Sequence, residues 1–196
     1  MSEPSENRSD AESYAQTDAD PARNETRLPE LARRAVETFV RERRVLEVPN
    51  LPLYSLLAQR AACFVSLKTE EGDLRGCIGT VEPTKATLAE ELIHNAISAA
   101  TRDPRFLPVA LSELSHLRYS VDVLSPPEPA QFEELDPKIY GLIVEDERGG
   151  RRGLLLPDLE GVETAEQQFQ ITARKAGISP RAEVKLYRFR VRRYGE

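Results

Sequence analysis

Cys77 is the residue of this sequence best placed to do chemistry, because it lies in the stretch RGCIGT two positions after Arg75. A thiol becomes a nucleophile when positive charge or backbone N–H groups stabilise its thiolate and solvent can reach it. On a strand, the side chains of Arg75 and Cys77 project from the same face. Gly76 and Gly79 carry no side chain, so a ligand can approach the backbone beside the sulfur. Cys77 is therefore a catalytic nucleophile, an unreactive residue of a ligand site, or a buried packing residue, and the sequence leaves all three open.

A nucleophilic cysteine needs a general base, and the chain has only two histidines. On a helical projection His94 lies away from the apolar face, so we expect it to face water. His116 lies in the polar connection LSELSHL, whose position the sequence does not fix. A Cys–His hydrolase is thus weakly indicated. The two cysteines and two histidines also lack paired metal-ligand spacing, so we expect no metal site and no cofactor.

The stretch RDPRF, residues 102 to 106, is the second candidate region. Arg102 can interact with the carbonyl end of the preceding helix, and Asp103 can pair with a neighbouring arginine, which together would make a structural corner. The alternative is functional. In that interpretation, Asp103 and Arg105 line the same pocket as Arg75.

Regular elements alternate along most of the chain. In the first half, the pattern predicts a helix with Pro29 in its first turn that extends to about Leu46, then a hairpin formed by residues 63–67 and the RGCIGT strand with a turn at Gly72, and then a helix from Thr84 or Thr87 to Pro104. A strand over 117–124 follows, with Tyr119, Val121 and Val123 on one side. The second half is predicted to form a hairpin that turns at Gly149 and Gly150, a helix over 164–176 that ends on Gly177, and one last alternating strand from Glu183 to Tyr194. Helices before, between and after hairpins indicate an α+β fold with a largely antiparallel sheet.

The register of the first hairpin decides where the two cysteines lie. A turn centred near Glu71 places Val65 opposite Cys77 and Cys63 opposite Gly79. The two thiols then lie diagonally, too far apart for a relaxed disulfide.

Charge is uneven along the chain. The net charge is -6, and residues 1–27, with seven acidic and three basic residues, account for -4 of it. This segment has a single aromatic residue and no apolar period, so we expect a disordered acidic leader followed by one domain over residues 28–196.

The nearly neutral charge of the domain disfavours nucleic acid as a partner. Arg188, Arg190 and Arg192 nevertheless share a strand face, and this row would either bind RNA or protect a sheet face. The sequence shows no membrane span and no secretion signal, so we expect a cytoplasmic protein.

Five stretches, GDLRGCIGTVEP, NAISAATRDPRF, YSVDVLSPPEP, YGLIVEDERGGRRGLLLP and ARKAGI, occur in the order and spacing of one family. The chain resembles the AMMECR domain family, which includes the AmmeMemoRadiSam system protein A group, from about Leu28 to Tyr194. The resemblance implies two unequal lobes forming one domain, with the signature hexapeptide near a cleft between them. The signature comprises Arg75, Gly76, Cys77, Ile78, Gly79 and Thr80, and a second block comprises Asp103, Pro104, Arg105 and Phe106.

The family implies partners but no reaction, because its members have no established activity. Its domain often occurs beside, or fused to, a Memo-type protein and a radical SAM enzyme. Many members have a cysteine where this chain has Ala173, so a mechanism that needs two thiols is not expected here.

Three functions follow from the residues and the resemblance together. In the first, Arg75, Cys77 and Arg105 line a polar cleft that binds a small molecule or a partner, alongside a radical SAM enzyme and a Memo-type protein. In the second, Cys77 attacks an electrophilic carbon. In the third, the protein binds nucleic acid in RNA modification.

Overall fold

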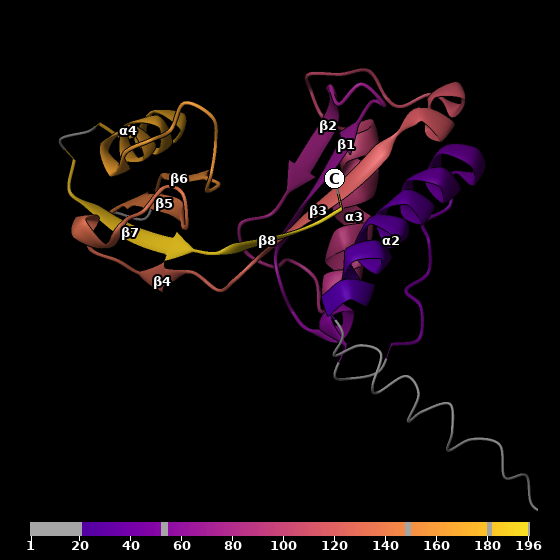
Figure 1. Cartoon of the computed structure of the whole chain (residues 1–196), viewed down its shortest axis with the longest axis horizontal. Coiled ribbons are helices and arrows are strands. Elements are labelled where there is room, and N and C mark those ends of the chain that lie inside the picture. Colours follow the sequence, from indigo (N-terminus) through magenta and orange to yellow (C-terminus); the bar gives the residue numbers. More distant parts are fainter. Residues whose placement is uncertain (1–20, 52–54, 148–149, 180–181, 196) are drawn as a thin grey trace, which may run out of the picture. The chain divides into compact units, whose positions relative to one another are not determined.

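The chain forms two compact units (Figure 1) in a computed structural model that describes residues 21–51, 55–147, 150–179 and 182–195. The first unit comprises the chain up to Val123 together with residues from Arg193 onward, and the second unit is Leu124–Arg192. Each unit has its own four-stranded sheet. Every strand pair with a described register is antiparallel, which confirms the predicted α+β class while dividing the expected single sheet into two.

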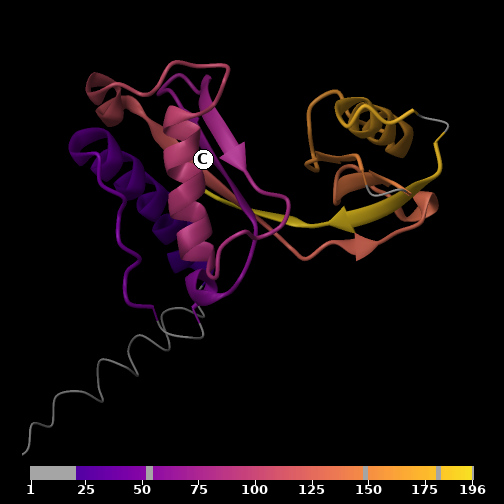
Figure 2. The ribbon, with the colours of Figure 1, turned by 180° about the vertical axis from the view of Figure 1, so that it is seen from behind.

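The first unit is a sheet with two long helices on one of its faces (Figure 2). Its strands are β1 (Cys63–Lys68), β2 (Leu74–Gly79), β3 (Arg118–Leu124) and β8 (Val191–Tyr194), in the order β2-β1-β3-β8. The helices α2 (Pro21–Glu42) and α3 (Leu88–Thr101) pack against each other, and α3 also packs against β1 and β2. Strand β2 therefore lies at one edge of this sheet.

Alternation of apolar residues explains how this sheet meets its helices. Residues 63, 65 and 67 of β1 pair with residues 123, 121 and 119 of β3, and all six are buried. The predicted grouping of Tyr119, Val121 and Val123 is thus confirmed. Helix α3 starts after the N-cap Thr87 with a capping box to Glu90, as expected from its sequence, and its alanines permit close packing on the strands.

The first helix starts earlier than the sequence predicts. It begins at Pro21, so Pro29 lies inside the helix and not in its first turn. Residues 21–27 of the expected disordered leader are therefore helical, while residues 1–20 lie outside the described residues. A proline inside a helix removes one hydrogen bond, and the apolar face of α2 that follows, with Leu31, Ala35 and Val36 buried, compensates through packing.

The register of the β1–β2 hairpin is wrong by one residue in the sequence-based prediction. Val65 pairs with Ile78, Ser66 with Cys77, and Phe64 with Gly79. Because side chains alternate, a slip of one residue exchanges the two faces of a strand. Cys63 therefore faces the helices, whereas Cys77 lies on the opposite face of the sheet.

The second unit is a sheet of order β4-β7-β5-β6 with one helix. Its elements are β4 (Glu128–Pro129), β5 (Gly141–Asp146), β6 (Arg152–Leu155), α4 (Ala165–Lys175) and β7 (Val184–Phe189). Helix α4 packs on β5 and β6, follows the N-cap Thr164 and ends before Gly177, whose φ is 65°. Of the predicted hairpin turn, Gly149 lies outside the described residues, but the β5–β6 pairing confirms the hairpin.

The last alternating stretch forms two strands and not one. Strand β7 ends at Phe189 and β8 starts at Val191, and the two belong to different sheets. Aromatic or apolar residues alternate with arginines from Tyr187 to Arg192, across this boundary, so the pattern does not reveal the division. None of the helices in the described part of the chain combines the length and the apolar character that a membrane span requires.

Candidate functional site

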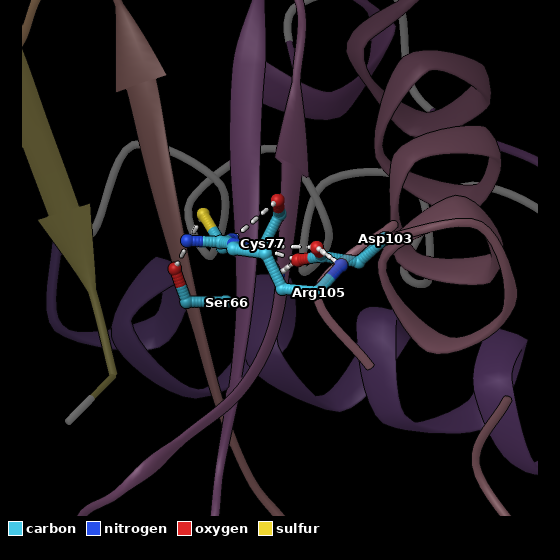
Figure 3. Close-up of polar contacts among 4 residues, drawn as sticks. All are labelled: Ser66, Cys77, Asp103 and Arg105. Carbon is cyan, nitrogen blue, oxygen red and sulfur yellow. Dashed lines mark hydrogen bonds and ion pairs between the residues drawn. The ribbon is translucent and has the colours of Figure 1, made fainter. Parts of the chain in front are cut away.

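Cys77 is held through its backbone by an acid–base pair from the segment after α3 (Figure 3). Its N–H donates to Asp103 Oδ2 at 2.8 Å, and Arg105 Nη2 lies 3.5 Å from its carbonyl oxygen. Since β2 is an edge strand, these groups would otherwise be available to another strand. The Asp103–Arg105 pair therefore closes the sheet edge at Cys77, and we call Ser66, Cys77, Asp103 and Arg105 the Cys77 centre.

Asp103 is buried and paired with Arg105. Its carboxylate accepts from Arg105 Nε at 2.9 Å and Nη2 at 2.7 Å, and its side chain is 2% exposed. The hydrogen bonds from the Arg105 side chain lower the pKa of Asp103 well below its usual range, and the backbone N–H groups of Cys77 and Arg105 add to this against the effect of burial. The guanidinium of Arg105 is neutralised locally by this carboxylate, although 55% of its side chain is exposed.

The thiol of Cys77 is half-buried on the face of the sheet away from the helices. The hydroxyl of Ser66, directly opposite on β1, donates to Cys77 Sγ at 3.2 Å. Cys63 lies on the other face with no exposed surface, and burial raises the pKa of its thiol to about 12. Both cysteines are free, as predicted, but the reason is that the sheet separates them.

The two glycines do not open space beside the sulfur, so this part of the sequence-based interpretation is wrong. Gly76 is buried against α3, and a Cβ there would overlap the carbonyl oxygen of Ala99. Gly79 lies under the ring of Phe64, which a Cβ would also overlap. Both glycines therefore permit close packing within the protein.

Arg75 does not share the environment of the thiol. The hairpin register shifts between Leu67 and Lys68, leaving Arg75 without a partner on β1. Such a bulge redirects a side chain. Its guanidinium binds Glu113 through Nε at 2.7 Å and Nη2 at 3.1 Å, and Nη2 also donates to the Leu107 carbonyl at 3.0 Å.

Phe106 connects the two arginines of the predicted pocket. The guanidinium carbons of Arg75 and Arg105 lie 5.8 Å and 5.5 Å from the centroid of its ring. Both cations are therefore placed beside one aromatic ring, where each gains a favourable interaction. The structure thus brings Asp103 and Arg105 to Cys77, and brings Arg75 only to the neighbouring ring.

Ile78 and Thr80, the remaining signature residues, have structural environments. Ile78 packs against the core of the first unit. The hydroxyl of Thr80 donates at 2.6 Å to Glu91, a carboxylate on α3 with no exposed surface. Glu91 also accepts from the backbone N–H groups of Thr84 and Lys85, at 2.7 Å each.

Sequence reasoning missed Glu91. Burial is the largest single influence on its pKa and acts to raise it, yet the hydrogen bonds from Thr80, Lys85 and Thr84 together outweigh burial and lower it. The one available signal was its place in the first turn of α3 near three polar hydrogen-bond donors. This buried charge fixes the segment between β2 and α3.

Neither histidine contacts the Cys77 centre. His94 is exposed on α3, as expected, and His116 Nδ1 lies 3.2 Å from Glu70 Oε2. Among the residues that the structure describes, no three His, Cys, Asp or Glu side chains are grouped to hold a metal ion. Ala173, where many family members have a cysteine, is buried in the core of the second unit.

The arginines near the C-terminal end of β7 are engaged within the second unit. Arg188 lies 3.7 Å from Glu128 and 3.9 Å from Glu134. Arg188 and Arg190 both lie 4.7 Å from the ring centroid of Tyr140. Arg188 and Arg190 thus contact side chains of their own unit, and whether this row binds nucleic acid stays a prediction.

Two antiparallel sheets with packed helices, and an edge thiol held by an aspartate–arginine pair, define a two-unit α+β protein. The chain belongs to the AMMECR1 family, whose model matches residues 29–194. This confirms the resemblance seen in the sequence.

Relatives and a solved structure support the same assignment. The chain is 52% identical over 163 residues to a protein of Thermotoga maritima, covering 82% of this chain and 92% of that protein. It is 47% identical over 150 residues to Protein CA_C1420 of Clostridium acetobutylicum, covering 76% of this chain but only 31% of that protein. The crystal structure of Uncharacterized Protein PH0010 from Pyrococcus horikoshii matches with a TM-score of 0.75 and 34% identity, covering 85% of this chain and 88% of that one.

Proposed function

We propose that this protein is a binding component of a modification pathway, in which the Cys77 centre contacts a small molecule or partner protein and a radical SAM enzyme and a Memo-type protein act alongside it. The observation that carries the proposal is the closure of the sheet edge by Asp103 and Arg105 around Cys77. This arrangement leaves a half-exposed guanidinium beside a half-buried thiol on a rigid strand. Arginine in such a position recognises carboxylate or phosphate groups.

The electrostatics favour binding over nucleophilic catalysis. A reactive thiolate requires nearby uncompensated positive charge or a general base. The nearest guanidinium is paired with the carboxylate of Asp103, and the Cys77 thiol accepts a hydrogen bond from the Ser66 hydroxyl. Both histidines, as described above, lie elsewhere in the first unit.

One relative supports the proposal that this protein functions together with other proteins. The matched region makes up 31% of the Clostridium acetobutylicum protein, so that protein contains additional sequence joined to this domain. A domain that is linked to others in one protein commonly works with separate chains in another, since linkage raises effective concentration.

Co-purification of the tagged full chain from its own cells tests the proposal. Arg105→Ala should lower recovery of the radical SAM enzyme and the Memo-type protein while leaving the fold intact. Arg44→Ala is a matched control, because Arg44 is 55% exposed and pairs with Glu42 as Arg105 pairs with Asp103. Equal recovery with both variants would contradict the proposal.

The cysteine separates the proposal from its enzymatic alternative. Under the binding function, Cys77→Ser should retain both partners and pathway function, because serine preserves the size and hydrogen bonding of the side chain. Retained partners with lost pathway function would instead support the Cys77 nucleophile.

A further inference from the structure

A concave surface of the first unit lies between α3 and the segment that follows α2. Its volume is about 400 Å³. It shares no residue with the Cys77 centre, and none of the functions above uses it. Figure 2 shows α2 and α3 side by side, and residues of both helices line this groove.

The floor and one wall of the groove are apolar. Ile93 and Ile97 of α3 and Phe39 of α2 line it together with Val45, Leu46 and Val48. Val45 is 58% exposed and Val48 39% exposed, so the wall keeps apolar surface in contact with water. Exposed apolar side chains that border a concave surface indicate a binding site more often than isolated ones do.

Polar residues follow one side of α3 along the groove. Glu90, His94, Ser98 and Arg102 recur at intervals of four residues, which places them on the same side of a helix. Glu90 is engaged at the N-terminal end, where its carboxylate accepts from the backbone N–H groups of Ala86 and Thr87. The acidic end of the groove is thus also the end near Lys85.

The opposite end carries positive charge without an acidic partner. Arg102 is exposed, and in the described part of the chain no carboxylate pairs with its guanidinium. Ser98, one turn before it, adds a hydroxyl to the same end. A cation also stabilises a helix C-terminus, but that role does not require the apolar wall beside it.

We propose that this groove binds a small ligand with an anionic head group on an apolar body, the head at Arg102 and Ser98 and the body along Ile97, Ile93 and Phe39. Charge complementarity sets the orientation, because the carboxylate of Glu90 offsets the charge of Lys85 at one end, whereas no acidic residue of the lining offsets Arg102 at the other. The volume falls in the range of small-molecule sites and favours such a ligand over a partner helix.

Calorimetric titration of the full-length protein with sodium decanoate, below its micellar concentration, tests this site. The expected result is saturable 1:1 binding. Arg102→Gln should weaken decanoate binding about tenfold while leaving binding of decan-1-ol unchanged, since only the charged hydrogen bond is lost. Equal weakening for both probes, or no effect on either, would overturn the assignment of the head group.

A second variant tests the apolar wall without a risk to folding. Ile93 is 3% exposed and a charge there would disrupt the core, so Val48→Glu is the better change. It should weaken both probes, whereas Ile139→Glu, at a similarly exposed residue of the second unit, should weaken neither. Unchanged binding in Val48→Glu, absence of saturable decanoate binding, or binding only of an acidic amphipathic helical peptide would each overturn the proposal.

Discussion

The backbone N–H of Cys77 and the carboxylate of Asp103 form a 2.8 Å hydrogen bond across 26 residues of sequence. It joins the edge of the first sheet to the corner that follows α3. Because Arg105 donates to both oxygens of this carboxylate, one buried acid accepts hydrogen bonds from a strand N–H and a guanidinium at once. The contribution of this acid to folding can be measured directly.

Asp103→Ala should destabilise the protein by about 2 to 3 kcal/mol, because it leaves the Cys77 N–H and the Arg105 guanidinium without their acceptor. Urea unfolding monitored by circular dichroism gives the free energy of unfolding. Asp73→Ala is the control, since Asp73 is exposed and should change stability little. If Asp103→Ala lowers the free energy of unfolding no more than the control does, the hydrogen bonds of Asp103 to Cys77 and Arg105 do not stabilise the fold.

Stability should decrease in acid through Asp103 and Glu91. The pKa of each is lower in the folded than in the unfolded protein. The stability that they contribute is therefore complete above their unfolded values, near about pH 4, and is lost as pH falls toward the folded values. Urea midpoints between pH 7 and pH 3 measure this loss. The double variant Asp103→Asn, Glu91→Gln should show a shallower decline than Glu47→Gln, an exposed control, and parallel curves would refute the assignment.

Gly76→Ala should destabilise the protein by about 1 to 3 kcal/mol, since its methyl group would overlap the backbone of α3, which cannot move cheaply. Gly150→Ala is the matched control, because no heavy atom lies within 4 Å of a Cβ at that position. Thermal unfolding of the two variants beside the parent compares them. A neutral Gly76→Ala would show that α3 and β2 are less closely packed than described.

The two thiols should differ sharply in reactivity. Cys77 should react with 5,5′-dithiobis(2-nitrobenzoate) in the folded protein, because it is half-buried and reaches solvent. Cys63 should react only after denaturation, since it has no exposed surface and its pKa is raised to about 12. Titration before and after addition of guanidinium should count one thiol and then two. Two fast thiols in the folded state would contradict the separation of the cysteines by the sheet.

The sequence predicts the elements of this fold better than their partners. Alternation identifies the hairpin that carries Cys77, but the additional residue at Arg75 is invisible in the pattern and shifts the register by one. That single residue moves Cys77 to the face opposite Cys63, whereas the predicted register places both thiols on one face. Likewise, the alternation of apolar and charged residues continues through Arg190 although the sheet does not, so the pattern does not mark the change of sheet.

The sequence predicts which residues form the candidate site but not which atoms contact each other. Asp103 and Arg105 follow a helix whose end is marked by Pro104, so their closeness to the preceding hairpin could be inferred. Their contact with the Cys77 backbone could not, because edge groups of a strand have no sequence signature. Glu91 was missed because burial of a charge depends on donors that come from three separate positions.

The second unit interrupts the first: the chain leaves the first sheet after β3 and returns to it only with β8. On the ribosome, β1, β2, β3 and both long helices emerge well before the strand that completes their sheet, and the whole of the second unit is synthesised in between. At about 5 to 20 residues per second, the intervening 69 residues (Leu124–Arg192) delay that strand by seconds. During this interval the edge of β3 that β8 later covers has no partner strand, and an unpaired edge of this kind can associate with other chains.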